Sequence, residues 1–589
     1  MHIVTRKYRA ACPPLLDVPF VKQQPGSKMS SYGAIGVDEN DTDPLIVEES
    51  RNERRRAVSL SESTVPHRQP YLFTGGLGLS REGSTVSLQD ENREQNMALR
   101  YRLYSRLDPG GRQLLMPAHV FPSEVFSILP FDELKDESGK QNSIVTIFSI
   151  WNTMMGTSLL AMPWALQQAG FAFGLILILG MAALCFYTAY IVVQSPKGLS
   201  HLGIDSASAE FTDVCKVLLG KYGEMSALVF SVLVLLGGVF VYWVLMSNFL
   251  YYTGNVFYEA LQPNSSTIPI MENRSFTCDV FCPKEFEKRP EEVWYNLVEE
   301  MTETAADSTS NTFDKFWSLQ GTVPIYLAIL LFPLLNFKSP TFFTKFNVLG
   351  TGSVMYLLVF TFSKLLECGV NLDFHNKNSI HYAALFNWKF PALTGTLTLS
   401  YFIHNAVLTI LRNQKNPENN ARDLSIGYGL VAFCYVFIAT CFYTAFPVER
   451  TCISDNFLNN FGSGDVLSSV ARVFLLFQMI TVLPLLVYLI RTQVFYAIYG
   501  ETWPGLWKVI LLNICVMLLA VSIAVFYPRV GSILRYVGAF SGLLYVFALP
   551  CLVYMTKRRL EGTLTQPVRY IHTAIVAAGL VNLIAQFVI

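Results

Sequence analysis

The chain has 589 residues, of which 52% are hydrophobic and 15% are charged, and its formal net charge at pH 7 is zero. Soluble domains carry about 25% charged residues, so this composition is typical of a polytopic membrane protein and excludes an ordinary soluble domain. Because basic residues are not in excess, the composition argues against a nucleic-acid partner.

The first 141 residues form a polar tail that lacks an apolar run long enough for a signal-peptide core. Its many Asp, Glu, Arg and Ser residues predict a mostly disordered, cytosolic segment ahead of a membrane domain at 142–589. Asp41 stands four residues before Leu45, and Tyr32 stands three before Ile35. Both spacings are typical of sorting signals, so we expect a lysosomal or late endosomal membrane protein.

Residues 101–130 of the tail mix aromatic, aliphatic and proline side chains that the segment cannot bury within itself. This composition favours a docking peptide for a partner protein. The alternative is a linker that packs on the cytosolic face of the chain's own membrane domain, and composition leaves both open. The side chains expected to dock are Tyr104, Leu107, Pro117, His119 and Pro122.

Beyond residue 141, runs of about twenty apolar residues recur, each long enough to cross a hydrocarbon core of about 30 Å. With the tail cytosolic, the loops on its side are rich in Lys and Arg, which agrees with the positive-inside rule. An odd number of spans places the C-terminus in the lumen. We expect an all-α fold of about eleven transmembrane helices at 143–169, 171–194, 225–258, 321–337, 346–366, 391–411, 424–446, 466–490, 506–526, 533–555 and 569–588.

The long acidic loop 259–320 falls on the luminal side and carries glycosylation sequons at Asn264 and Asn273. Cysteines in luminal loops meet an oxidising environment, which favours disulfide bonds. The sequence does not decide how they pair. The disulfide candidates are Cys278, Cys282 and Cys452.

The first span contains an unusually polar stretch. Residues 152–158 supply Asn, Thr, Gly, Thr and Ser where a plain spanning helix would carry Leu and Val, and Pro163 follows. A helix that breaks in hydrocarbon needs protein, water or ligand to satisfy its freed backbone groups. The alternative is that small and hydroxyl residues only allow neighbouring helices to approach closely. The clustering of these residues before a proline favours a binding site.

The sixth span repeats this feature, because small and hydroxyl residues at 394–400 precede the polar pair His404 and Asn405. Many secondary transporters repeat a five-helix unit in inverted orientation and bind substrate where the first helix of each unit is broken. The span count and the matched polarity predict this arrangement here. His404 also has an alternative role as a neutral histidine that is hydrogen-bonded to a neighbouring helix.

A half-helix N-terminus presents free N–H groups that suit a carboxylate, and a half-helix C-terminus presents carbonyls that suit an ammonium group or Na⁺. We expect the backbone at Thr157 and Ser158 to bind the carboxylate. The amide oxygen of Asn152 suits a hard cation, and Thr481 in the eighth span adds a second oxygen for a Na⁺ site. The candidate substrate-binding residues are Met154, Met155, Gly156, Thr157, Ser158, His404 and Asn405.

Motifs of soluble enzymes are absent from the sequence. It has no Gly-rich phosphate loop, no His-Glu-x-x-His and no paired Cys-x-x-Cys pattern. This argues against an enzyme, and Na⁺ as a coupling or structural ion is the one cofactor that we consider.

The stretch Trp-Asn-Thr-Met-Met-Gly-Thr-Ser at 151–158 resembles the sodium-coupled neutral amino acid transporter family. The resemblance continues through Phe-Ile-His-Asn at 402–405 and Glu-Asn-Asn-Ala-Arg-Asp-Leu at 418–424 and covers the whole membrane region. It implies an eleven-span fold of the LeuT type with broken first and sixth helices. It also implies a lysosomal protein that moves amino acids out of the lumen and responds to arginine.

The same resemblance implies residue roles and partners. Thr157 matches the family's substrate-site threonine, and Asn152 with Thr481 are similar to its cation-site positions. The implied partners are arginine, leucine and other neutral amino acids, membrane lipids, and, at the tail, the Rag GTPases and Ragulator, which signal to mTORC1. The tail departs from the family pattern at 125–130. A pure arginine receptor with little transport, and a plain cation-coupled transporter without signalling, remain alternatives.

Overall fold

The computed structural model describes only part of the tail and most of the membrane domain. Among the expected docking and glycosylation residues, only Leu107 is described, in a two-residue strand β1 (Arg106–Leu107) that pairs antiparallel with β2 (Gln113–Leu114). Tyr104, Pro117, His119, Pro122, Asn264 and Asn273 lie outside the described residues. The described residues are 106–107, 113–114, 126, 141–199, 202, 209–261, 278–283, 313, 316–338, 341–344, 346–412, 414–462 and 464–588.

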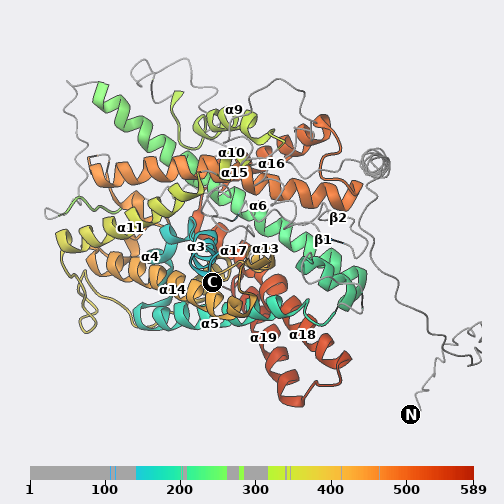
Figure 1. Ribbon diagram of the computed structural model, residues 1–589. Helices are drawn as coiled ribbons and strands as arrows, with labels where there is room; N and C mark the ends of the chain where they lie inside the picture. The colour runs from blue at the N-terminus through green and yellow to red at the C-terminus, as the bar shows by residue number, and fades with distance from the viewer. Residues whose placement is uncertain are drawn as a thin grey trace, which may run out of the picture. The chain divides into compact units, whose positions relative to one another are not determined.

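Helices make up nearly all of the described structure, which confirms the expected all-α membrane fold (Figure 1). Eight of them are long and apolar enough to cross a membrane alone, and one pair qualifies together although it is bent by 62°. The eleven expected spans correspond in chain order to α3 (Ser143–Met154) with α4 (Ser158–Ala169), α5 (Phe171–Gln194), α6 (Phe211–Leu261), α9 (Val323–Leu335), α11 (Asn347–Cys368), α12 (Pro391–Ser400) with α13 (Val407–Arg412), α14 (Asn420–Ala445), α15 (Val466–Tyr499), α16 (Leu506–Phe526), α17 (Val530–Gly542) with η7 (Leu543–Ala548) and α18 (Leu549–Leu560), and α19 (Gln566–Ala585). Of these, α9 and the pair of α12 with α13 are not among the helices that are long and apolar enough to span.

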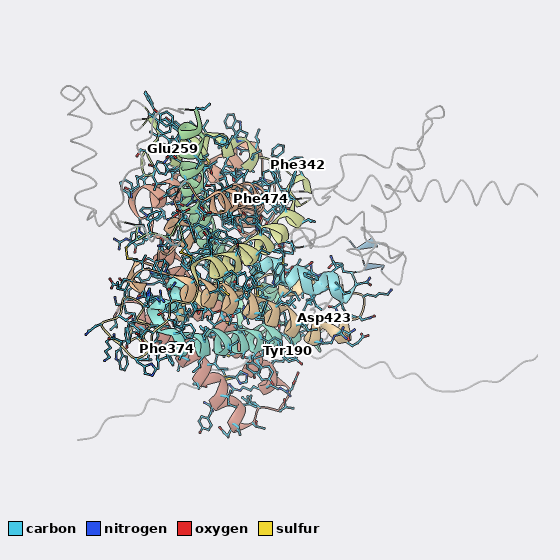
Figure 2. All side chains as sticks on the ribbon, turned by 90° about the vertical axis from the view of Figure 1, so that its left-hand side faces the viewer. Tyr190, Glu259, Phe342, Phe374, Asp423 and Phe474 are labelled. Atoms are coloured by element: carbon cyan, nitrogen blue, oxygen red, sulfur yellow. A yellow bond between two sulfur atoms is a disulfide. The ribbon has the colours of Figure 1, made fainter. Side chains whose placement is uncertain are left out.

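Short helices connect some of these segments. Four of them lie in the loops, namely α10 (Thr341–Thr344), η4 (Pro417–Asn419), η5 (Arg450–Cys452) and η6 (Phe457–Asn460). The connectors alternate between the two faces of the helical bundle. Figure 2 shows Glu259 and Phe374 on one side, and Phe342 and Asp423 on the opposite side.

The first and sixth segments are broken, as the family resemblance implies. Helix α3 ends at Met154, Met155 is extended with φ −75° and ψ 96°, and α4 begins at Ser158. In the sixth segment α12 ends at Ser400, and α13 begins only at Val407. Glycine and β-branched threonine lower helix propensity, which explains why the first break falls around Gly156.

The small residues in the first half of the sixth segment allow close helix packing. A Cβ atom at Gly538 of α17 would lie 2.1 Å from the carbonyl oxygen of Gly395, and one at Gly542 would lie 2.1 Å from Thr398 Cγ2. Neither contact leaves room for a side chain. The alternative interpretation of small residues as packing residues therefore holds for this half-helix.

Two disulfides fasten residues 278–283 to the bundle. Cys278 pairs with Cys368 at the end of α11, and Cys282 pairs with Cys452 in η5. The three expected cysteines are all disulfide-bonded. Cys368 was not among the expected disulfide cysteines, because it closes an apolar span and its partner lies 90 residues away in the chain.

Candidate functional site

The first break leaves donors without acceptors. The N–H of Met155 still donates to Trp151 O at 2.8 Å, and the next backbone N–H groups to find acceptors are those of Leu159 and Leu160. Among the described residues, the N–H groups of Gly156, Thr157 and Ser158 have no acceptor. They sit at the N-terminus of the 12-residue helix α4, where the helix dipole adds partial positive charge. This geometry suits a carboxylate.

Tyrosine hydroxyls of α14 satisfy the carbonyl ends of the two breaks. Tyr435 Oη lies 3.0 Å from Met154 O, at the end of α3, and 3.0 Å from Ser400 O, at the end of α12. Tyr428 Oη donates to Tyr401 O at 3.0 Å. Both tyrosines are buried, and Tyr435 therefore links the two broken helices to each other through α14.

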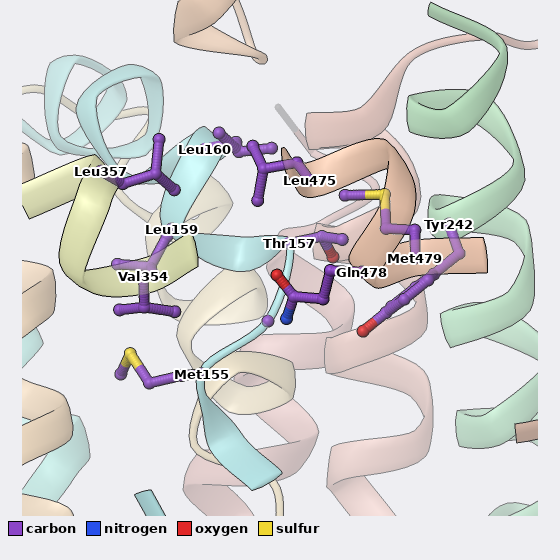
Figure 3. A pocket seen from close by; sticks show the side chains of 11 residues that line it. Met155, Thr157, Leu159, Leu160, Tyr242, Val354, Leu357, Leu475, Gln478 and Met479 are labelled. Carbon is purple, nitrogen blue, oxygen red and sulfur yellow. The ribbon is translucent and has the colours of Figure 1, made fainter. Parts of the chain in front are cut away.

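A small cavity opens at the first break (Figure 3). The cavity has a volume of about 10 Å³, which is about enough for one water molecule. An amino acid would therefore need the lining side chains to move. Four residues give it a polar end, namely Gly156, Thr157, Tyr242 and Gln478. The remaining lining is apolar and consists of Met155, Leu159, Leu160, Val354, Leu357, Leu475 and Met479.

The expected substrate residues of the first span lie in or beside this cavity. Met155, Gly156 and Thr157 line it. Met154 contributes a carbonyl that Tyr435 already occupies, and Ser158 begins α4 as a buried residue. The cavity thus forms where the sequence analysis places the carboxylate site.

The polar pair of the sixth span lies away from the cavity lining. His404 is fully buried, and its Nε2 is 2.9 Å from Thr188 Oγ1 on α5. The Thr188 hydroxyl is within bonding distance of the Leu184 and Cys185 carbonyls, and a hydroxyl that donates to a carbonyl accepts from the imidazole N–H. This arrangement supports the alternative of a histidine hydrogen-bonded to a neighbouring helix.

Asn405 points toward α6. Its Nδ2 lies 3.4 Å from Ser231 Oγ, which also accepts from Gln493 Nε2 at 2.9 Å. These contacts join the sixth span to α6 and α15. Among the described residues, no contact places Asn405 at the cavity.

The candidate cation residues have oxygen-rich surroundings. Asn152 Oδ1 lies 3.4 Å from Thr351 Oγ1 of α11, and Thr481 Oγ1 donates to Gln478 O at 2.7 Å. The described residues contain no cluster of three His, Cys, Asp or Glu side chains that could hold a metal. Neutral amide, hydroxyl and carbonyl oxygens fit Na⁺, a hard cation.

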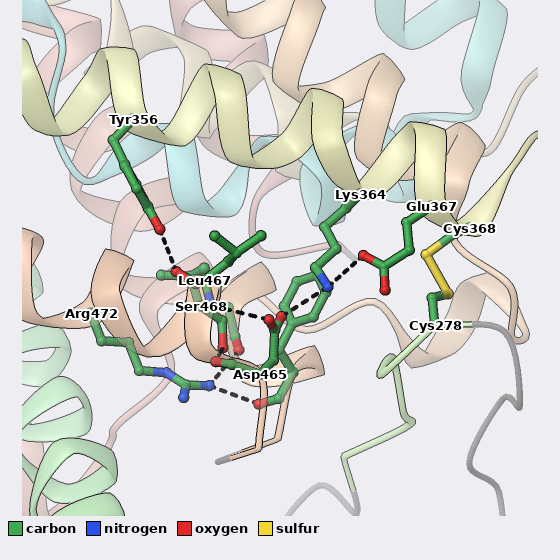
Figure 4. Close-up of polar contacts among 11 residues, drawn as sticks. Cys278, Tyr356, Lys364, Glu367, Cys368, Asp465, Leu467, Ser468 and Arg472 are labelled. Carbon is green, nitrogen blue, oxygen red and sulfur yellow. Dashed lines mark hydrogen bonds and ion pairs between the residues drawn. A yellow bond between two sulfur atoms is a disulfide. The ribbon is translucent and has the colours of Figure 1, made fainter.

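A buried charge cluster joins the two helices α11 and α15 on the disulfide side of the cavity (Figure 4). Lys364 Nζ of α11 lies 3.2 Å from Asp465 Oδ2, at the start of α15, and 2.8 Å from Glu367 Oε2. The side chains of Lys364 and Asp465 are 5% and 6% exposed. Arg472 of α15 donates to the carbonyls of Leu458 and Phe461. These contacts hold together two walls of the cavity.

A second buried ion pair lies on the opposite face. Arg412 Nη2 at the end of α13 is 2.9 Å from Glu210 Oε1, which also accepts from Thr409 Oγ1 at 2.9 Å. Burial raises the pKa of the Glu210 carboxyl, and the Arg412 guanidinium opposes that rise. The ends of the sixth span and of α6 are therefore tied together at this face.

Several residues of the site were not among the candidates. Tyr242, Gln478 and Tyr435 are polar side chains within apolar spans, and Lys364 is an ionisable one. An intramembrane ionisable residue is a functional candidate by default. The position of Lys364 within an apolar span could therefore have marked it as a candidate. The tyrosines carried no such signal, because their partners lie on other spans.

The chain is similar to known proteins that are named as amino acid transporters. The model of the family described as transmembrane amino acid transporter protein matches residues 139–277 and 301–589. The sodium-coupled neutral amino acid transporter 9 homolog of Caenorhabditis elegans is 67% identical over 587 residues, which cover 95% of each chain. Neutral amino acid transporter 9 of Xenopus tropicalis is 42% identical over 83% of this chain and 89% of its own length.

A rat protein and one solved structure are also similar to this chain. Neutral amino acid transporter 9 of Rattus norvegicus is 39% identical over 92% of this chain and 97% of its own length. A crystal structure of MhsT in complex with L-phenylalanine superposes with a TM-score of 0.46 and 12% sequence identity, and covers 74% of this chain and 98% of that chain.

Replacing Tyr435 with Phe tests the link between the two breaks. The variant leaves the Met154 and Ser400 carbonyls without this donor, and we expect it to lower stability by about 1–3 kcal/mol because buried carbonyls become unsatisfied. The measurement is thermal unfolding of the purified protein in detergent. Tyr570→Phe, at an exposed tyrosine of α19, is the matched control. Equal melting temperatures for the two variants would contradict the link.

The charge cluster predicts a second stability effect. Lys364→Met leaves the buried Asp465 carboxylate without its cation, and we expect a loss of about 3 kcal/mol. The control is Lys216→Met, which removes an ion pair with Glu224 whose side chains are 59% and 36% exposed and which is worth at most about 1 kcal/mol. Thermal unfolding in detergent measures both. If Lys364→Met is no less stable than Lys216→Met, the buried pair does not hold α11 to α15.

Proposed function

Because the chain belongs to the transmembrane amino acid transporter family, we propose that it moves amino acids by alternating access around the break between α3 and α4. The observation that supports this most directly is the set of backbone N–H groups at 156–158 without an acceptor among the described residues, beside a cavity that Gly156 and Thr157 line. The substrate carboxylate binds these N–H groups. An aliphatic side chain fits among the leucines at the other end.

Coupling to Na⁺ forms part of the proposal. The Caenorhabditis elegans relative is named as sodium-coupled. Asn152 and Thr481 are the proposed ligands, because the Asn152 amide oxygen at the end of α3 and the Thr481 hydroxyl oxygen of α15 are neutral oxygens. A bound Na⁺ would add positive charge next to the carboxylate site, so substrate and ion would bind better together.

We place the disulfide face in the lysosomal lumen. Disulfides persist in oxidising compartments, and both of them lie on this face. Gln586 near the C-terminus donates to Pro391 O, at the luminal start of α12, which supports a luminal C-terminus. Gln141 pairs with Gln414 at the opposite face, which supports a cytosolic tail. The sorting motifs and the family resemblance favour the lysosomal membrane over other membranes.

The tail carries the signalling half of the proposal. We place docking to the Rag GTPases and Ragulator at 101–130, with arginine in the lumen as the signal that reaches mTORC1. Such coupling requires that substrate bind two conformational states with different affinity. A pure arginine receptor would bind without transport, and a plain transporter would work without its tail. Transport and partner binding, measured on the same variants, separate these alternatives.

Thr157→Trp tests the transport site. The indole would fill the polar end of the cavity, and we expect uptake of labelled leucine and arginine into proteoliposomes to fall to the level of empty vesicles. Ser522→Trp, at an exposed hydroxyl residue of α16, controls for the insertion of a bulky side chain into a spanning helix. Undiminished uptake by Thr157→Trp would place the substrate path elsewhere.

Substitutions in the tail test signalling separately. We expect Tyr104→Ala and Pro117→Ala in the full chain to abolish co-purification of Rag GTPases and Ragulator, because the docking side chains are lost, while amino acid uptake stays at the wild-type rate. Tyr71→Ala, at a tail tyrosine outside residues 101–130 and outside the sorting motifs, is the control. Partner recovery that is unchanged by both docking variants would remove this half of the proposal.

A further inference from the structure

Gln478 is a buried amide with an unused acceptor. It lies on α15, is 8% exposed and lines the cavity at the first break. Its Oε1 is buried and has no hydrogen-bond partner. Figure 3 shows the Gln478 side chain among the residues that line the cavity, between the Thr157 and Tyr242 side chains on one side and Met155 on the other. Buried polar atoms are nearly always hydrogen-bonded, so the structure calls for a donor that enters the cavity.

The identity of that donor follows from the groups around it. The free N–H groups of 156–158 suit the carboxylate of an amino acid and cannot accept a hydrogen bond. An α-ammonium group has three donors and no acceptor, so it needs oxygens. The carbonyls of Met154 and Ser400 share the single hydroxyl proton of Tyr435, and the Tyr401 carbonyl accepts from Tyr428. Gln478 Oε1 is the buried side-chain acceptor that stays open at the polar end.

We propose that Gln478 accepts a hydrogen bond from the α-ammonium group of the substrate and thereby determines selection of amino acids over acids that lack this group. The proposal deepens the transport function stated above and rests on it. The described residues that line the cavity include no Asp or Glu. An amide therefore recognises the ammonium by hydrogen bonding, and the ligand's own carboxylate, held at 156–158, balances its charge.

Gly350 of α11 positions the Gln478 amide. A Cβ atom at this glycine would lie 2.9 Å from Gln478 Nε2 and 3.4 Å from its Cδ. The Gln478 amide occupies the space that a side chain at position 350 would fill. Gly350→Ala therefore displaces the Gln478 amide without removing it, and it tests the same recognition from a second helix.

A coupling ion is the competing explanation for the free oxygen. The same Cβ position at Gly350 lies 3.4 Å from Asn152 Oδ1, so the Gln478 amide and the candidate cation ligand both pack against this glycine. If Gln478 bound Na⁺, its loss would weaken the response of uptake to Na⁺. If it binds the ammonium, its loss weakens discrimination between ligands that differ only at the α-substituent.

The test compares leucine with 2-hydroxy-4-methylpentanoate, which replaces the ammonium with a hydroxyl. Uptake of labelled leucine by the full chain in proteoliposomes gives KM, and inhibition by the hydroxy acid gives its binding constant. We expect Gln478→Met to raise the KM for leucine about tenfold or more, as for loss of a hydrogen bond to a charged group. The hydroxyl of the hydroxy acid can donate only a neutral hydrogen bond to Gln478, so its constant should rise less, by about threefold.

Three further variants make the outcome specific. Gln478→Glu keeps an acceptor and should retain the preference for leucine, whereas Gly350→Ala should reduce it. Gln493→Met removes an amide from the same helix outside the cavity and should leave the preference unchanged. Equal weakening of both ligands by Gln478→Met, or an altered Na⁺ dependence with the preference intact, would overturn the assignment.

Ligand-induced stabilisation in detergent separates this proposal from transport itself. The rise in melting temperature with leucine, compared with that with the hydroxy acid, reports the preference without any flux. A preference that Gln478→Met abolishes supports the assignment even if wild-type vesicles show no uptake, an outcome that would count against transport alone. A preference that Gln478→Met leaves intact overturns the assignment whether or not uptake occurs.

Discussion

The fold depends on how two helices broken within the bilayer satisfy their backbone groups. Hydrocarbon offers no hydrogen bonds, so the carbonyls and N–H groups freed at each break need partners. Tyr435 of α14 meets the carbonyl ends of both breaks with one hydroxyl. The N–H groups at 156–158 receive no such partner. The protein thus gives the carbonyl ends a hydroxyl partner and leaves the N–H groups at 156–158 for an anionic ligand.

The surroundings of the cavity follow from this asymmetry. Helices α6, α11 and α15 supply the remaining walls, and a buried ion pair ties helices together on each face of the bundle. The cavity between them is nearly closed. A transport cycle would have to loosen these two connections in turn, since an amino acid is much larger than the space described. Buried ion pairs suit such a role, because breaking one costs several kcal/mol and re-forming it requires the same two side chains to meet again.

The sequence predicted the framework well, since the length of each apolar run and the polar residues within it act locally. It located the first break at 152–158 and the sixth near 400, and the helices end there. It placed three cysteines in disulfides but missed Cys368. It placed His404 in the substrate site, whereas that side chain meets Thr188 of α5. The polarity of a residue shows that it needs a partner, and it does not show which one.

The sequence by itself determined that this chain spans the membrane as helices, that two of them break, and that the first break offers donors for an anion. The tertiary structure alone decided what surrounds that break. Tyr435 follows Met154 by 281 positions, and Gln478 lies still farther along the chain. Such groups meet only when separate helices pack, because side-chain contacts depend on distance in space, while hydropathy and helix breaks depend on neighbours in the chain.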